Sequence, residues 1–275
     1  MSFSHLVLIW LAGATVVVAA AGVETNPRVL MDEMTTTEVR DAIKSGKTTV
    51  LIFNASTEAT GPALVLGKHI FRARYLGERI ARELGNALVA PIMPFAPTSD
   101  ERRFPGTIHV SPETFSRVNE EVADSMVKAG FKYIILMGDH GGNQAPLKEL
   151  APKLDERYRS QGTRVFFSGD AYAKSDHDIE DYLKEHGYPP SRHGGVADTS
   201  LLWAVGAQYV RQDKIAMGEP TQRPYPQELT LGSIGVEGDP RRSSPELGKM
   251  FLDWKVKNGV AEIRKLIPDS QAGKD

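Results

Sequence analysis

Cysteine is absent from the 275 residues, and this absence removes several kinds of chemistry. Without thiols the chain has no disulfide, no cysteine nucleophile and no thiolate metal site. Any metal ion must therefore be held by histidine, aspartate or glutamate. An excess of basic charge is also absent, because the formal net charge is −2 at pH 7. This balance gives no indication of binding to nucleic acid.

Long apolar runs are absent except at the N-terminus. The segment "LVLIWLAGATVVVAAAG", Leu6 to Gly22, ends in small residues and predicts a secretory signal within residues 1–22. It lacks a preceding lysine or arginine and is almost long enough to span a bilayer, so an uncleaved membrane anchor is an alternative reading. Either reading predicts an exported protein, periplasmic or secreted; a buried N-terminal helix is the third possibility.

The rest of the chain, residues 23–275, alternates apolar segments with amphipathic ones and predicts a single domain. We expect strands over residues 48–54, 87–95, 132–137 and 163–170, and helices over residues 36–45, 68–84, 111–130, 143–160 and 244–267. Residues 218–240 are rich in proline and glycine and indicate an ordered loop region. Apolar strands separated by amphipathic helices predict an α/β fold with a mainly parallel sheet flanked by helices on both faces.

Polar residues gather just after the predicted strands. In parallel sheets ligands bind beyond the carboxyl ends of the strands, where we expect Glu58, Asp139, His140, His193 and Asp198. Each of them has a structural explanation: Glu58 suits the first turn of a helix and Asp198 suits a helix cap. Their convergence favours a functional site, and a histidine after a buried strand is costly unless its ring nitrogens are used.

The motifs around these residues resemble those of the creatininase (creatinine amidohydrolase) family. The segments "STEATGPALVLGKH", "FPGT", "GDHGGN", "HGGVADTS" and "GVEGDP" occur in the family's order. There the pattern runs approximately STEQHGPHLPLGTD, FPGT, NGHGGN, HAGE or HGGV followed by an acid-Thr-Ser, and GxxGDP. The resemblance spans Val50 to Leu252. It implies a three-layer sandwich, metal-dependent hydrolysis of amide-like C–N bonds in small, often cyclic substrates, and a homo-oligomer, typically a hexamer.

The resemblance assigns roles to four positions. Glu58 matches the family's first carboxylate ligand, and His140 matches the histidine of the strand-end motif. His193 matches the histidine regarded as the acid/base, and Asp198 stands where the family has a glutamate. We therefore expect His193 and Asp198 to be catalytic.

Other positions depart from the family pattern. Thr60 replaces the histidine of "EQHGP", His69 replaces the bridging aspartate, and Gly142 stands where creatininase carries a glutamate. Two metal ions usually share a carboxylate bridge, and a neutral imidazole at position 69 would be a poor one. We therefore expect one ion rather than two.

The expected ligands of that ion are Glu58, His69 and His140. Two histidines and one carboxylate suit Zn²⁺ with an open position for water, and Mn²⁺ is a second possibility. Asp139 is a further candidate ligand, or a partner that orients an imidazole, and Asp198 has the same two alternatives. A fold that has lost its metal is the main rival hypothesis.

The predicted activity is hydrolysis of a small cyclic amide-like substrate by metal-activated water, with His193 near Asp198 moving the proton. Hydrolysis of another cyclic carbonyl compound, a lactone or a ring ketone, is one alternative. A non-catalytic binding protein is the other. Residues 100–103, "DERR", could recognise substrate, but a solvated charge run is the interpretation that we favour.

Overall fold

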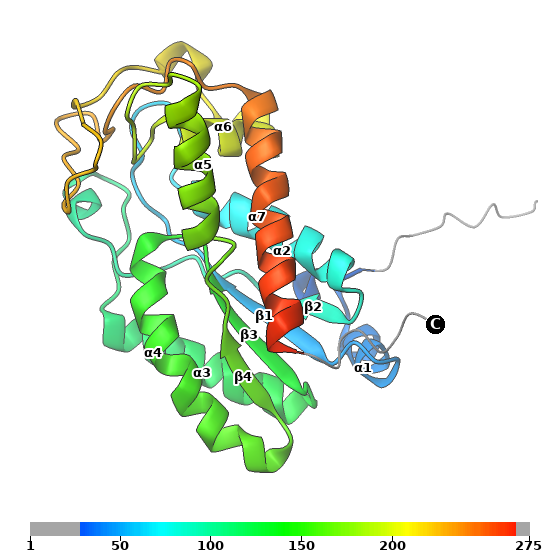
Figure 1. Ribbon diagram of the computed structural model, residues 1–275. Helices are drawn as coiled ribbons and strands as arrows, with labels where there is room; N and C mark the ends of the chain where they lie inside the picture. The colour runs from blue at the N-terminus through cyan, green and yellow to red at the C-terminus, as the bar shows by residue number, and fades with distance from the viewer. Residues whose placement is uncertain (1–27, 268–275) are drawn as a thin grey trace, which may run out of the picture.

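The computed structural model describes residues 28–267, and its centre is a four-stranded parallel sheet (Figure 1). The strand order is β2-β1-β3-β4. The strands are β1 (Thr49–Asn54), β2 (Ala87–Val89), β3 (Tyr133–Gly138) and β4 (Arg164–Phe167). The two central strands pair along their whole length, from Thr49 opposite Tyr133 to Asn54 opposite Gly138. Both strands therefore end at the same rim of the sheet.

Helices cover both faces of this sheet, which confirms the predicted three-layer α/β sandwich. The α-helices are α1 (Thr36–Lys44), α2 (Lys68–Leu84), α3 (Pro112–Ala129), α4 (Gly141–Tyr158), α5 (Ala173–Glu185), α6 (Val196–Val205) and α7 (Pro245–Leu266). Short 3₁₀ segments are η1 (Met31–Glu33), η2 (Asp100–Arg103), η3 (Arg159–Gln161), η4 (Ala207–Tyr209) and η5 (Gln212–Lys214).

Successive residues of β1 enter two different apolar cores. Leu51 and Phe53 pack with residues of α2, α5, α6 and α7, whereas Val50 and Ile52 pack with residues of α3 and α4. Because side chains alternate between the faces of a strand, a strand that is apolar at every position needs a covering layer on each side. Helices α2 and α7 run along one face in Figure 1, and α3 and α4 lie on the other.

Some elements differ from the sequence prediction. Strand β2 ends at Val89 rather than at residue 95, because Pro91 and Pro94 cannot donate to a strand ladder. Helix α4 begins at Gly141, two residues early, because the His140 side chain caps it. Helix α5 was not predicted. It has no side-chain cap, and its many charged residues show little apolar signal.

The predicted localisation is corrected. Within residues 28–267 no helix is long and apolar enough to cross a membrane. The apolar segment at residues 6–22 lies outside the described residues, as does the predicted domain boundary at residues 22–23. Export and membrane anchoring are therefore without support.

Candidate metal centre

Three buried residues from three parts of the chain meet beyond the carboxyl ends of β1 and β3. Glu58 lies in the loop after β1, His69 in the first turn of α2, and His140 directly after β3. One potential ligand atom from each lies within 4.8 Å of the others. We call these three residues the triad. Their convergence follows from the parallel pairing of β1 with β3, which brings the two strand ends to one rim.

The Glu58 carboxylate lies between the two imidazoles. Its Oε1 is 2.8 Å from His69 Nε2, and its Oε2 is 2.8 Å from His140 Nε2. Within residues 28–267, however, no group donates a well-aligned hydrogen bond to Oε2. Burial opposes ionisation of Glu58, but His140 and His69 outweigh it and hold its pKa well below the usual range. Glu58 is therefore an anion with one oxygen open to a further partner.

His140 is held in a fixed orientation by the start of α4. The Gly142 amide donates to His140 Nδ1 at 3.2 Å, and the Asn143 side chain accepts from the His140 amide at 3.0 Å. With Nδ1 occupied by this cap, Nε2 is the nitrogen that faces Glu58. A neutral ring that keeps this contact carries its proton on Nε2. A neutral ring that held a metal ion through Nε2 would carry its proton on Nδ1 instead and would give up the contact with the Gly142 amide.

The triad fits a divalent transition metal by its donors. Two imidazole nitrogens and one carboxylate form a donor set found in catalytic zinc sites, where an open position remains for water or substrate. The contact of buried Glu58 Oε2 with His140 is not a well-aligned hydrogen bond, which supports this match because buried acceptors usually have a well-placed donor. Residues Glu58, His69 and His140 are therefore suited to hold one Zn²⁺ or Mn²⁺ ion.

Asp139 lies beside the triad and outside it. Its Oδ2 is 2.8 Å from His69 Nδ1 and also accepts from Arg72 Nε at 2.8 Å. Burial disfavours the charged carboxylate, but Arg72 and His69 outweigh it and lower the pKa of Asp139 to about 2. Of the two roles predicted for Asp139, the contacts match the orienting partner of an imidazole and not the ligand.

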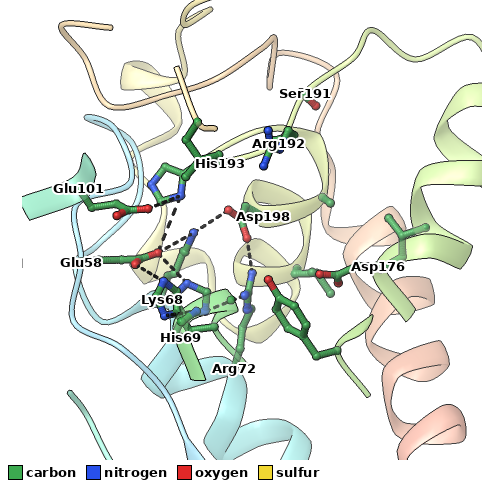
Figure 2. A pocket seen from close by; sticks show the side chains of 18 of the residues that line it. Glu58, Lys68, His69, Arg72, Glu101, Asp176, Ser191, Arg192, His193 and Asp198 are labelled. Carbon is green, nitrogen blue, oxygen red and sulfur yellow. Dashed lines mark hydrogen bonds and ion pairs between the residues drawn. The ribbon is translucent and has the colours of Figure 1, made fainter. Parts of the chain in front are cut away.

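Asp198 is occupied by two cations of helix α2. Its Oδ1 accepts from Arg72 at 2.6 Å, and its Oδ2 accepts from Lys68 at 2.6 Å and from the Gly194 amide at 3.0 Å. Burial opposes ionisation, but Lys68 and Arg72 hold the pKa of Asp198 well below its usual range. Asp198 therefore joins the His193 loop to α2 (Figure 2).

His193 presents one free ring nitrogen to the site. Its Nε2 lies 2.8 Å from the Ala59 carbonyl oxygen, and because a carbonyl only accepts, Nε2 carries the proton. Nδ1 of a neutral ring then faces Glu58 Oε1 at 3.9 Å and Glu101 Oε1 at 4.0 Å. Burial and the Lys68 charge lower the pKa of His193. A neutral ring can accept a proton on Nδ1, and Asp198 lies near His193 because its carboxylate accepts from the adjacent Gly194 amide.

Glu101 was not expected in the site. The segment "DERR" forms η2, and within it Glu101 is buried and turned toward His193 (Figure 2). Its Oε2 accepts from the amide and the hydroxyl of Ser99. Arg102 and Arg103 are exposed, so the interpretation as a solvated charge run holds for them and fails for Glu101.

Gly142 is required by a close backbone approach. A Cβ at this position would lie 1.9 Å from the Pro97 carbonyl oxygen. No larger side chain fits there without a shift of the Pro97 loop. The position where creatininase carries a glutamate is thus closed to a ligand in this chain.

The triad opens into a cavity of about 730 Å³. Beyond the charged residues already described, its walls carry Tyr172, Asp176, Glu180, Arg192 and Tyr225. The volume lies in the range of pockets that take drug-sized ligands. A small cyclic amide would occupy only a part of it.

Lys68 and Arg72 are the site residues that the sequence analysis missed. Both lie on α2 and are buried, with 1% and 3% of their surface exposed. A signal was present: the segment ending in "LGKH" has lysine where the family pattern "LGTD" has threonine, directly before the expected ligand His69.

Comparisons with known proteins show the family of the chain. A family model described as creatininase (creatinine amidohydrolase) matches residues 32–263. Creatinine amidohydrolase of Pseudomonas putida is 22% identical over 256 residues, covering 87% of this chain and 98% of that protein. The mycofactocin precursor peptide peptidase of Mycolicibacterium smegmatis is 23% identical over 232 residues, covering 80% and 86%.

Solved creatininase structures share the fold. A manganese form of creatininase and the zinc–zinc form of a glutamate-to-glutamine mutant each superpose with a TM-score of 0.74 at 21% identity. Each match covers 88% of this chain and 99% of the creatininase chain. At this identity the likeness shows the three-layer fold.

Proposed function

The chain belongs to the creatininase family of metal-dependent hydrolases, and from this premise we propose that it hydrolyses the C–N bond of a small cyclic amide. One observation supports the proposal most: the buried cluster of Glu58, His69 and His140, whose ligand atoms lie within 4.8 Å of one another. The substrate class rests on the family and on the curated relative that acts on creatinine.

The residues of the triad would hold one divalent ion. Zn²⁺ is the ion that we favour, and Mn²⁺ is the alternative. When bound, such an ion polarises the scissile carbonyl and lowers the pKa of a water toward ~7. Asp139 fixes the orientation of His69 through Nδ1, and before a metal binds the cap of α4 fixes that of His140. The protein thereby keeps both rings aimed at Glu58.

His193 would move the proton. Its Nδ1 is free of backbone partners and lies 3.9 Å from Glu58 Oε1, in the wall of the cavity into which the triad opens. The lowered pKa keeps the ring neutral near pH 7, so it can take a proton from water and return it to the leaving nitrogen. Asp198 would position the His193 loop through the Gly194 amide.

A larger amide, such as a peptide end, is a second candidate. The cavity of about 730 Å³ exceeds what a small ring needs, and one curated relative is named as a peptide peptidase. The alternatives of a lactone or ring-ketone hydrolase and of a non-catalytic binding protein stay as hypotheses, as does assembly into a hexamer.

A substrate screen tests the proposal. Protein stripped with EDTA and reloaded with Zn²⁺ or Mn²⁺ would be assayed on cyclic amides of increasing size, on lactones and on short peptides. We expect hydrolysis of at least one cyclic amide, lost on stripping and restored by metal. Hydrolysis of peptides alone would favour the second candidate. Inactivity on all substrates with the metal bound would contradict both.

His193→Gln tests the assigned proton carrier. We expect kcat to fall by about 10²–10⁴-fold with KM little changed, the usual loss when a general base is removed. His186→Gln is a matched control, because His186 is an exposed histidine that bonds the Tyr182 carbonyl outside the site. Equal activity of the two variants would remove His193 from the mechanism.

A further inference from the structure

Lys68 is a buried lysine at the centre of the candidate site. Only 1% of its surface is exposed, although a buried ammonium is costly unless anions surround it. Its Nζ lies 2.6 Å from Asp198 Oδ2 and 3.6 Å from Glu58 Oε1. Figure 2 shows the ammonium between these two carboxylates.

This position is one that a second cation would otherwise take. Glu58 Oε1 contacts the triad on one side, at His69 Nε2, and Lys68 on the other. In sites with two metal ions, both ions share one carboxylate at close range. In this chain the bridging position is His69, and Glu58 beside it contacts candidate ligands through His69 and a covalently tethered positive charge through Lys68.

The remaining carboxylates near Lys68 are also neutralised by the chain. Arg72 contacts both Asp139 and Asp198, and Lys68 contacts Asp198. A second divalent ion would therefore have to displace a buried ion pair and would meet the repulsion of an ammonium held close to Glu58. Of these carboxylates, only Glu58 remains available to a metal ion, on the side that faces the two histidines.

We propose that the Lys68 ammonium stands in place of a second metal ion and limits the site to one divalent ion per chain. The inference rests on the proposed function, since it requires that the triad binds a metal. Lys68 supplies a fixed positive charge beside Glu58 and weakens the attraction of the triad for its own ion. Its removal therefore tightens metal binding. A merely structural lysine would have the opposite effect, because Glu58 and Asp198 would lose their common partner.

The experiment measures the dissociation constant and stoichiometry of Zn²⁺ and Mn²⁺ by competition with a chromogenic chelator. The proteins are the wild type, Lys68→Met, Lys68→Gln and Lys255→Met. Lys255 is a matched control: it is equally buried, at 1% exposure, but pairs with Asp176 and the Ala171 carbonyl. Circular dichroism verifies that each variant is folded, and Lys68→Gln replaces Lys68→Met if the latter is not.

We expect one ion per wild-type chain, at least tenfold tighter binding in either Lys68 variant, and a change of less than about threefold in Lys255→Met. Unchanged or weaker binding in the folded Lys68 variants would overturn the role of Lys68 and leave the metal site intact. A stoichiometry of two ions per wild-type chain would by itself overturn the proposed role of Lys68. Absence of binding in all four proteins would instead contradict the proposed function itself.

Discussion

The two sides of His69 neutralise their carboxylates in different ways. On the Nδ1 side, Asp139 and Asp198 have permanent cations from the chain itself, Arg72 and Lys68. On the Nε2 side, Glu58 has two imidazoles at 2.8 Å, Lys68 lies farther away at 3.6 Å from Oε1, and Oε2 has no well-aligned donor within residues 28–267. We call the Nδ1 side, with Asp139 and Asp198, the closed side, because its carboxylates are fully paired within an ion-pair network. We call the Nε2 side, with Glu58, the open side, because a metal ion can replace a proton there. Within one cluster, the closed side is therefore expected to stabilise the fold and the open side to bind the metal ion.

The closed side is expected to carry most of the stability. Arg72→Met leaves the buried Asp139 and the partly buried Asp198 without their shared cation, and breaking a buried ion pair costs about 3–5 kcal/mol. Arg74→Met, two residues along the same helix, removes a partly exposed pair with Asp32 and is expected to cost about 0–1 kcal/mol. Chemical denaturation of both variants measures the two values. Similar values would show that the network around Arg72 has no special weight.

The open side is expected to respond to metal instead. A ligand present at one hundred times its dissociation constant stabilises the native state by about 2.7 kcal/mol, so Zn²⁺ should raise the melting temperature of the wild type. Glu58→Gln removes the carboxylate ligand and should abolish this rise. Glu237→Gln, at a carboxylate that is also fully buried, should preserve it. Thermal unfolding with and without Zn²⁺ measures the rise in melting temperature. An equal rise in both variants would show that the metal binds elsewhere.

A partly exposed ion pair outside the cluster is expected to make the smallest of these contributions to the free energy of unfolding. Asp155 accepts from Arg164 and from the Val165 amide, and although burial opposes this, these partners lower its pKa. A lowered folded-state pKa gives stability that is present above the unfolded value of about 3.9 and is lost as the pH falls through the folded value. The free energy of unfolding of the wild type should therefore exceed that of Asp155→Asn by up to about 1 kcal/mol at pH 7, and the difference should shrink as the pH falls through the folded-state pKa.

Denaturation of the two proteins at a series of pH values between 2 and 7 measures this difference. A gap that stays constant across the series would show that the charge of Asp155 contributes nothing and that only the shape of the side chain matters.

Much of the fold follows from local sequence, and the charged interior does not. The segment at residues 68–84 shows helical periodicity and forms α2 with those bounds. The end of strand β2 was not predicted correctly, because the prolines after Val89 shorten the strand. Helix α5 was not predicted, because it lacks both a side-chain cap and a clear apolar pattern. The triad could be named from its motifs because each member follows a strand or opens a helix at the functional rim.

The cations of the site could not be named in this way. A lysine or arginine in an amphipathic helix is normally assigned to the solvent face, and only tertiary contact with Asp139 and Asp198 shows that Lys68 and Arg72 are buried. Likewise the position of Glu101 depends on how the η2 loop folds back toward His193. Sequence spacing does not show these long-range charge pairings, and the lysine of "LGKH" marked Lys68 as a departure from the family pattern without showing its partners.

The most direct test is the metal content per chain, measured by plasma mass spectrometry on protein purified without a metal-binding tag. The account predicts about one zinc or manganese ion per wild-type chain and its loss in His140→Ala. Two ions would contradict the separation between the open and closed sides. No ion, even after incubation with excess Zn²⁺ and Mn²⁺, would contradict the metal centre and favour a binding protein on this fold.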